Sequence, residues 1–299
     1  INFKLYNRVH MMRRVQQVMM KLGVGHLQAL ETKLQLEREA RSEVLSDVIS
    51  SDTSFFRDSR EFDFFKSSIA PQILRRANSS RRPVRIWVCG CSTGEEVYSI
   101  AIALCEIIDA SDDLRNAQVR LFATDMNEDL LRQARLGEYQ IRTHEVDTMR
   151  LKRFFTSSSN KYRAAQRLRS MVMFGKHDVL RQMPYMNIDL MACRHMMSLL
   201  TAEGRLQLLS SAHEALQTNI QDSSSESGFL WLGQSEDLHG DANEAFRRVD
   251  PSASFFHALA IEESGAAPRL RAQYLSNQLS ATAIEREMFG AASSTASAT

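Results

Sequence analysis

The sequence predicts an α/β fold: a doubly wound, mostly parallel sheet, preceded by a small all-helical domain and interrupted by a small inserted subdomain. Three observations predict it. Apolar runs alternate with helical segments from residue 84 onward, residues 1–50 have a helical pattern throughout, and the alternation weakens over residues 138–170. Strands that alternate with helices form parallel sheets, and right-handed crossovers place the helices on both faces.

Residues 1–78 are predicted to form the N-terminal helical domain and its junction with the sheet. The first 50 residues contain no proline, and their apolar side chains recur at steps of three and four, as on one face of a helix. An aromatic cluster of five phenylalanines, at positions 55, 56, 62, 64 and 65, would pack this domain on the next one. Residues 78–83, Asn-Ser-Ser-Arg-Arg-Pro, break the pattern and mark the boundary.

The second predicted domain, residues 79–264, contains the alternating elements. Strands are expected at residues 84–89, 119–124, 171–174, 188–193 and 228–233, with helices at residues 95–108, 128–136 and 202–216. Residues 138–170, in which Lys, Arg, Ser and Tyr are interleaved, form the inserted subdomain. Residues 265–299 are expected to be a linker or disordered tail, because the last nine are only Ala, Ser and Thr.

Composition excludes several classes of protein. The 299 residues are 43% hydrophobic, which supports a substantial core, and a formal net charge of +1 argues against bulk binding to nucleic acid. No apolar run approaches the roughly 18 residues of a membrane span, so no membrane insertion is expected. The four cysteines lack CxxC spacing and the eight histidines lack metal-ligand spacing, which predicts a cytoplasmic protein with reduced thiols and no metal site. The chain begins at Ile1, which suggests a segment excised from a longer protein.

The most informative segment is the turn after the first strand, Gly90-Cys-Ser-Thr-Gly-Glu-Glu96. Gly90 and Gly94 remove side chains where a ligand must approach the backbone. A helix N-terminus carries partial positive charge and suits phosphates, but Glu95 and Glu96 would repel a pyrophosphate and attract a cationic ligand. The turn therefore favours S-adenosylmethionine, with its ammonium and sulfonium, over a dinucleotide.

Four residues fall just after predicted strands: Gly90, Asp125, Asp178 and Arg194. One crevice would collect them, because ligands of such folds bind beyond the carboxyl ends of strands. Asp125 suits two ribose hydroxyls, although an Asp at a strand end is also a common helix cap. Arg57 follows two phenylalanines and Arg194 follows an apolar strand, so each should meet an anion, either a ligand or a structural partner. His177 and His195 are interpreted as structural residues.

Five segments, in their order and spacing, resemble the CheR family of chemoreceptor glutamate methyltransferases: residues 51–58 (SDTSFFRD), 90–96 (GCSTGEE), 122–128 (FATDMNE), 188–194 (IDLMACR) and 228–236 (GFLWLGQSE). The resemblance covers about residues 1–260. It is strongest to CheR domains fused to methylesterase and sensor domains, because the insertion is short and Tyr162-Arg is followed by Phe174-Gly-Lys-His-Asp178. It implies the Rossmann-like fold of S-adenosylmethionine-dependent methyltransferases.

The resemblance also implies roles for individual residues around S-adenosylmethionine and its product, S-adenosylhomocysteine. Glu96 would bind the amino group, Asp125 the ribose, and the pair at positions 178 and 179 the adenine. Arg57 would be the catalytic residue, pairing with the cofactor's carboxylate near the transferred methyl. By similarity, the cofactor-binding residues are Ser51 (where the family often has Asn), Thr53, Arg57, Gly90, Glu96, Asp125, Asp178, Val179, Cys193 and Arg194.

The implied substrate is a glutamate side chain on the cytoplasmic helical bundle of a chemoreceptor. A glutamate carboxylate has a pKa near 4.3 and is already ionised at neutral pH, so it attacks a sulfonium methyl with no proton to remove. The reaction needs positioning and desolvation rather than a general base. The missing Ser/His/Asp constellation therefore does not exclude an enzyme.

The chain departs from the family at four further positions. His195 replaces the usual Asn, and Leu199 replaces a Tyr near the reacting centre, which weakens the expected alignment of the substrate. In the N-terminal domain, Asn7 and His10 stand where fused members often have Lys and Thr, and this domain is expected to dock the receptor. One alternative is a catalytically weakened or inactive regulatory module that binds S-adenosylmethionine. A dinucleotide oxidoreductase is disfavoured by the two acids of the turn.

Overall fold

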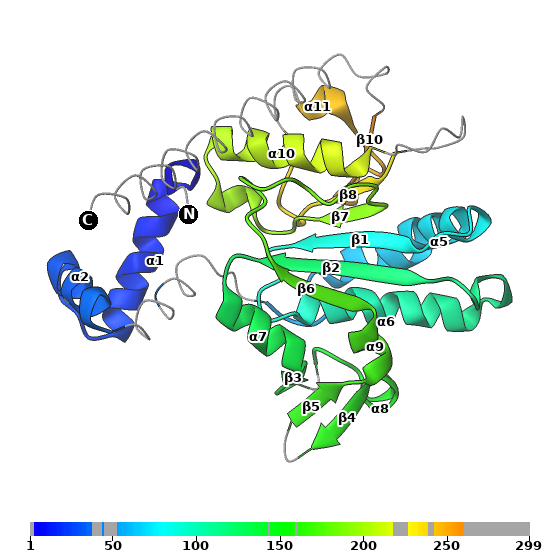
Figure 1. Ribbon diagram of the computed structural model, residues 1–299, viewed down its shortest axis with the longest axis horizontal. Helices are drawn as coiled ribbons and strands as arrows, with labels where there is room; N and C mark the ends of the chain where they lie inside the picture. Colours follow the sequence, from blue (N-terminus) through cyan, green and yellow to red (C-terminus); the bar gives the residue numbers. More distant parts are fainter. Residues whose placement is uncertain are drawn as a thin grey trace, which may run out of the picture.

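Figure 1 shows the computed structural model, which describes residues 3–37, 44, 53–142, 144–158, 161–217, 227–238 and 242–259. The helices are η1 (Phe3–Leu5), α1 (Arg8–Lys21), α2 (Leu27–Leu36), α4 (Ser59–Phe64), η2 (Phe65–Ile69), α5 (Ala70–Ser79), α6 (Glu95–Ala110), η3 (Asp112–Leu114), α7 (Glu128–Leu136), α8 (Thr148–Phe154), α9 (Gln166–Ser170), η4 (Met197–Leu199), α10 (Ala202–Leu216) and α11 (Ala242–Ala245). The strands are β1 (Val84–Cys89), β2 (Val119–Asp125), β3 (Glu138–Tyr139), β4 (Phe155–Ser158), β5 (Lys161–Ala164), β6 (Val172–Lys176), β7 (Leu190–Ala192), β8 (Phe229–Trp231), β9 (Phe246–Arg248) and β10 (Phe255–Ala258). Ser51 and the predicted tail, residues 265–299, lie outside the described residues.

The main sheet has seven strands in the order β6-β2-β1-β7-β8-β10-β9. The pairs β1–β2, β2–β6, β1–β7 and β7–β8 are all parallel, which confirms the mostly parallel sheet. The chain runs outward from β1 to β2 and β6, then returns to β7 on the other side of β1. The carboxyl ends of β1 and β7 therefore form a topological switch point, the usual ligand site of such sheets.

The last two strands were absent from the sequence prediction. β10 pairs antiparallel with both β8 and β9, and β9 contains only three residues. The antiparallel pairing of β10 depends on partners elsewhere in the chain, which the local sequence pattern does not show. They extend the sheet beyond the predicted end at residue 233.

Two hydrophobic clusters cover the two faces of the sheet, with α6 and α7 on one side and α10 and α11 on the other (Figure 1). The predicted aromatic cluster packs into the first: Phe65 stacks on Trp231 with ring centroids 5.3 Å apart, and Phe62 meets the same indole edge to face at 5.1 Å. Trp231 is fully buried. The junction after the N-terminal helices is thus fastened directly to the middle of the sheet.

The N-terminal helices α1 and α2 have a small apolar cluster of their own around Val18 and Leu30. The helical pattern over residues 1–50 is interrupted between Lys21 and Leu27, where Gly23 adopts a φ of 65°. In Figure 1 both helices lie beside the edge of the sheet at which β1 ends.

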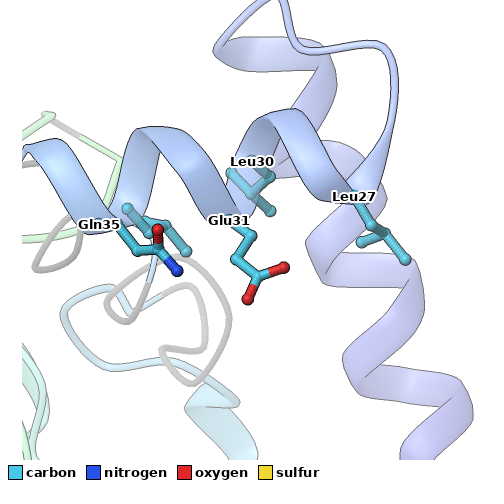
Figure 2. Close-up of a pocket in the computed structure, with 5 residues that line it drawn as sticks. Leu27, Leu30, Glu31 and Gln35 are labelled. Carbon is cyan, nitrogen blue, oxygen red and sulfur yellow. The ribbon is translucent and has the colours of Figure 1, made fainter.

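Within the described residues, no helix is both long and apolar enough to cross a membrane. Figure 2 shows a shallow groove on α2, lined by Leu27, Leu30, Glu31, Leu34 and Gln35.

The predicted insertion, residues 138–170, contains α8, α9 and an antiparallel sheet in the order β3-β5-β4. In Figure 1 this hairpin projects from the side of the sheet that carries α7. Its first strand also reaches the glycine turn, because the Tyr139 hydroxyl donates to the Thr93 carbonyl at 2.8 Å. The insertion therefore helps to fix the turn.

Candidate functional site

The glycine turn joins the end of β1 to the start of α6, and its conformation requires glycine at two positions. Gly90 and Gly94 have φ angles of 65° and 95°, in the left-handed region that side chains disfavour. A Cβ on Gly94 would lie 3.0 Å from both the Ala134 Cβ and the Tyr139 hydroxyl. A Cβ on Gly90 would meet the Met196 sulfur at 3.1 Å. The turn is therefore closely packed, with its backbone presented at the carboxyl edge of the sheet.

A second segment, residues 53–58, crosses this edge with an unusual backbone. Phe56 and Asp58 have φ angles of 51° and 60°, although neither is glycine. Such conformations persist only where the surroundings impose them, and they cluster at functional sites. Here the Phe56 amide donates to the Ser99 hydroxyl of α6 at 3.0 Å. The strained segment is thereby anchored one turn along the helix that begins at the glycine turn.

Arg194, directly after β7, connects these two segments through a fully buried guanidinium. Its Nη1 donates to Glu96 Oε2 at 2.8 Å, and its Nη2 donates to Asp58 Oδ2 at 2.8 Å and to the Arg57 carbonyl at 2.7 Å. The side chain is 0% exposed. The guanidinium also lies over the Trp231 ring, 4.7 Å from its centroid. One buried cation therefore holds two carboxylates, from α6 and from the strained segment.

The charges in this cluster are not fully satisfied. Burial raises the pKa of Glu96, although the neighbouring charge of Arg194 opposes the rise. Within the described residues, Glu96 Oε1 takes part in no hydrogen bond, and the buried Arg194 Nε has no acceptor. A carboxylate oxygen and a guanidinium nitrogen thus remain available to a ligand that carries both a cation and an anion.

His195 faces the same cluster in its neutral form. Burial lowers the pKa of His195 to about 4, assisted by the positive charges of Arg57 and Arg194. Its Nε2 lies 3.1 Å from Asp58 Oδ2. At neutral pH the imidazole is therefore uncharged and adds no cation to the two arginines.

Asp125, at the end of β2, links that strand to the glycine turn. Its Oδ2 accepts from the Ser92 amide and its Oδ1 from the Asn127 amide, both at 2.9 Å. The N-cap of α7 is Asn127, whose side chain accepts from the Asp129 amide, so Asp125 is not the cap of that helix. Burial raises the pKa of Asp125, while the backbone hydrogen bonds lower it. Each of its oxygens keeps a second lone pair for a hydroxyl donor.

Glu236 is a residue of the site to which the sequence assigned no role. The buried carboxylate accepts from four backbone amides: His195 at 2.9 Å, Met197 at 2.7 Å, Ser198 at 3.4 Å and Gly233 at 2.9 Å. These contacts hold the segment after Arg194 against the sheet. A possible signal was the position of Glu236 at the end of a matching segment, but its acceptor role depends on the tertiary fold.

The structure brings half of the predicted cofactor-binding residues into one small pocket between the glycine turn, residues 53–58 and the end of β7. Thr53, Arg57, Gly90, Glu96 and Arg194 all line it, and the free volume between the side chains is about 20 Å³. The other lining residues are Ser54, Cys91, Ser92 and His195.

The remaining predicted residues lie outside this pocket. Asp125 stands behind the turn, and Asp178 and Val179 follow β6, which is the strand beyond β2. Cys193 is 0% exposed, and its amide donates to the Trp231 carbonyl at 2.9 Å. Ser51 is not among the described residues. Beside the pocket, Arg194 also has a partner that the sequence did not suggest, Asp58, whose only signal was its place beside Arg57. Within the described ranges, no group of three or more His, Cys, Asp or Glu side chains could hold a metal ion.

Comparison with known proteins identifies relatives over most of the chain. A family described as CheR methyltransferase, SAM binding domain, matches residues 51–255. The chemotaxis protein methyltransferase of Listeria innocua is 28% identical over 81% of this chain and 87% of its own length. Chemotaxis protein methyltransferase 1 of Pseudomonas aeruginosa is 28% identical over 76% of this chain and 81% of its own length.

Two further matches differ in extent. An uncharacterized 104.1 kDa protein of Rhodobacter capsulatus is 28% identical over 80% of this chain, and this chain spans only 24% of that protein. Among solved structures, the DhpI complex with S-adenosylhomocysteine is 13% identical over 72% of this chain and 82% of that one, with a TM-score of 0.31.

Proposed function

Because the chain belongs to the CheR methyltransferase family, we propose that it transfers the methyl group of S-adenosylmethionine to glutamate carboxylates of chemoreceptors in chemotaxis. The observation that carries the proposal is the cluster of Glu96, Arg194 and Asp58 beside the glycine turn. It combines a carboxylate suited to an ammonium group with a guanidinium suited to a carboxylate. The amino-acid end of the cofactor carries these two charges.

The residues of the pocket fit that end of the cofactor. Glu96 Oε1 would accept from the ammonium, and the buried Arg194 Nε, which has no acceptor among the described residues, would meet the carboxylate together with Arg57. The free volume of about 20 Å³ is close to that of one water molecule. Binding of the cofactor's amino-acid end would therefore require side chains that line the pocket to move aside.

The order of the strands suggests where the rest of the cofactor lies. Asp125 at the end of β2 would hold the ribose hydroxyls, as acidic residues do in dinucleotide folds. The next strand, β6, is followed by Asp178 and Val179, which would frame the adenine. The amino-acid end, the ribose and the base would then follow the ends of β1, β2 and β6 in order.

The chemistry requires little of the protein beyond this placement. When bound, S-adenosylmethionine supplies an electrophilic methyl group on a sulfonium. The substrate carboxylate is ionised at neutral pH, so the carbon–oxygen bond forms as the carbon–sulfur bond breaks, with no proton transferred. His195, neutral because its pKa is about 4, is not needed as a base. Arg57 and the strained segment would orient the reacting end and exclude water.

The substrate in this proposal is the cytoplasmic helical bundle of a chemoreceptor. The support is that relatives in Listeria innocua and Pseudomonas aeruginosa are named chemotaxis protein methyltransferases. We also propose that further signalling domains are fused to this segment, since the relative in Rhodobacter capsulatus is much longer than the matched part. We also propose that the N-terminal domain ends at residue 78 and that the methyltransferase domain ends at residue 264.

A transfer assay tests the function directly. The chain would be incubated with S-adenosylmethionine labelled in the methyl group and with receptor cytoplasmic fragments. The expected label is a carboxyl ester, released as methanol by mild base. Cofactor binding without transfer to any receptor fragment would instead support the regulatory module, for which Leu199 is the motivating residue.

Replacing Leu199 by the tyrosine that is usual in the family gives a second test of the proposed reaction. Leu199 is half-buried and cannot hydrogen-bond through its side chain. Leu199→Tyr should raise kcat more than it changes cofactor affinity, because a phenol near the reacting centre would align the substrate. An unchanged or lower kcat, with the protein folded, would contradict this role for position 199.

A further inference from the structure

The N-terminal domain is joined to the sheet at the wall of the proposed cofactor site. The Asn7 amide donates to the Leu199 carbonyl at 2.8 Å, and the Thr201 amide donates to the Leu5 carbonyl at 2.9 Å. Between them, Tyr6 pairs with Leu200 in an isolated antiparallel bridge. Residues 5–7 therefore run along the segment that follows Arg194.

This attachment places the Tyr6 side chain at the end of β2. The hydroxyl donates to the Met126 sulfur at 3.5 Å, across 120 residues of sequence. Burial raises the pKa of Tyr6 to about 12, with further contributions from the charges of Asp178 and Asp125. The phenol therefore stays protonated at neutral pH and remains a hydrogen-bond donor. It faces the acids that follow two neighbouring strands.

The position coincides with the adenosine half of the proposed site. A ribose held by Asp125 directs its base away from β1, toward the end of β6, where Asp178 and Val179 lie. Tyr6 contacts Met126, the residue that follows the proposed ribose-binding acid Asp125. A thioether sulfur is only a weak acceptor. The bond from the Tyr6 hydroxyl to Met126 is therefore weaker than a bond to a nitrogen or oxygen of a ligand would be.

We propose that Tyr6 is an adenosine-binding residue contributed by the N-terminal domain, with its ring against the base and its hydroxyl donating to the adenosine in place of Met126. The proposal rests on the cofactor placement given under Proposed function. It has a consequence for regulation. Since Tyr6 directly precedes α1, cofactor binding and the position of the N-terminal helices would be thermodynamically linked.

The test is a pair of matched variants titrated with two ligands. Tyr6→Phe removes only the hydroxyl, and Tyr162→Phe makes the same change in β5 of the inserted hairpin. S-adenosylhomocysteine and 5′-methylthioadenosine share the adenosine, but the second lacks the amino acid. We expect Tyr6→Phe to weaken both ligands by the same factor, about three- to tenfold by calorimetry. Tyr162→Phe should change neither by more than about twofold.

Two further variants keep the outcome decisive. Tyr6→Ala also removes the ring and should weaken both ligands about tenfold or more, because stacking on a base contributes in that range. Asp125→Ala reports on the placement of the ribose itself. If it loses affinity while both Tyr6 variants bind as the wild type does, the inference fails and the proposed function stands. A loss at Tyr6 confined to S-adenosylhomocysteine would also overturn it, because the residue would then act on the amino-acid end.

Discussion

The short strand β7 has a buried charge at each end, and the two charges are satisfied in opposite ways. Before the strand, the Asp189 carboxylate accepts from Arg76 at 2.8 Å and from Arg82 at 2.6 and 2.8 Å. After the strand, the Arg194 guanidinium lies between the carboxylates of Glu96 and Asp58. At the amino end of β7 one carboxylate, Asp189, is paired with two arginines. At the carboxyl end one arginine, Arg194, is paired with two carboxylates.

The pKa values reflect this difference. Burial alone would raise the pKa of Asp189, but the hydrogen bonds and charge of Arg82 hold it below its usual value. The pKa of Glu96 is raised by burial in spite of Arg194. Among the described residues, a buried guanidinium nitrogen without an acceptor occurs at both ends, Arg82 Nε and Arg194 Nε, but only the second cluster holds a carboxylate of raised pKa beside a pocket. The same residue types thus serve structure at one end of β7 and are suited to binding at the other.

The largest expected effect is at the amino end. Asp189→Asn leaves Arg76 and Arg82, each about one-fifth exposed, without their shared carboxylate. We expect the free energy of unfolding to fall by about 3 kcal/mol, the lower part of the range for a broken buried ion pair. Denaturant titration measures this. Affinity for S-adenosylhomocysteine should remain within about twofold of wild type, and a large loss would contradict the structural assignment.

The next largest effect is expected at the proposed cofactor site, at the end of β2. Asp125→Ala should weaken binding of S-adenosylhomocysteine by about 1–3 kcal/mol through lost hydrogen bonds to a charged acceptor. Asn127→Ala is the matched control, because it removes the cap of α7 and should lower stability by about 1 kcal/mol without a comparable loss of affinity. Calorimetry and thermal unfolding separate the two. Unchanged affinity in Asp125→Ala would remove that residue from the site.

The smallest effect concerns pH. The pKa of His195 is about 4 in the folded protein and roughly 6.5 in an unfolded chain, so the unfolded state binds more protons between these values. Wild-type stability should therefore decrease as pH falls from 6.5 toward 4. Relative to His195→Asn, wild type should lose roughly 1 to 1.5 kcal/mol between pH 7.5 and 5.5. Parallel denaturation curves for the two proteins over that range would contradict the low pKa.

Local patterns were sufficient to predict much of the fold. The helices at Glu128–Leu136 and Ala202–Leu216 match their predicted limits, because each begins at a side-chain cap, Asn127 and Thr201 respectively. The strands β9 and β10 were missed because β10 is defined by its antiparallel pairing with β8 and β9, which the local sequence does not show. Long-range pairing cannot be inferred from such segments alone.

The residues of the candidate site likewise fall into those that local motifs predicted and those that depend on tertiary contacts. Motifs identified Glu96, Arg194 and Arg57, which the structure places around one pocket. They did not identify Asp58 as a partner of Arg194, which is 136 residues away. Nor did they identify the four backbone amides from which Glu236 accepts hydrogen bonds. These contacts arise from tertiary packing rather than from local sequence. The roles of individual residues toward the cofactor remain predictions for the experiments above.

The most direct test of the unequal ends of β7 is a calorimetric comparison of wild type and Glu96→Gln with two ligands. The carboxylate of Glu96 is expected to recognise the cofactor's ammonium, which S-adenosylhomocysteine has and 5′-methylthioadenosine lacks. Loss of a charge-assisted hydrogen bond predicts about a ten- to hundredfold weaker affinity for S-adenosylhomocysteine. Affinity for 5′-methylthioadenosine should change by less than about threefold. Equal losses for both ligands, or no loss for either, would contradict the assignment.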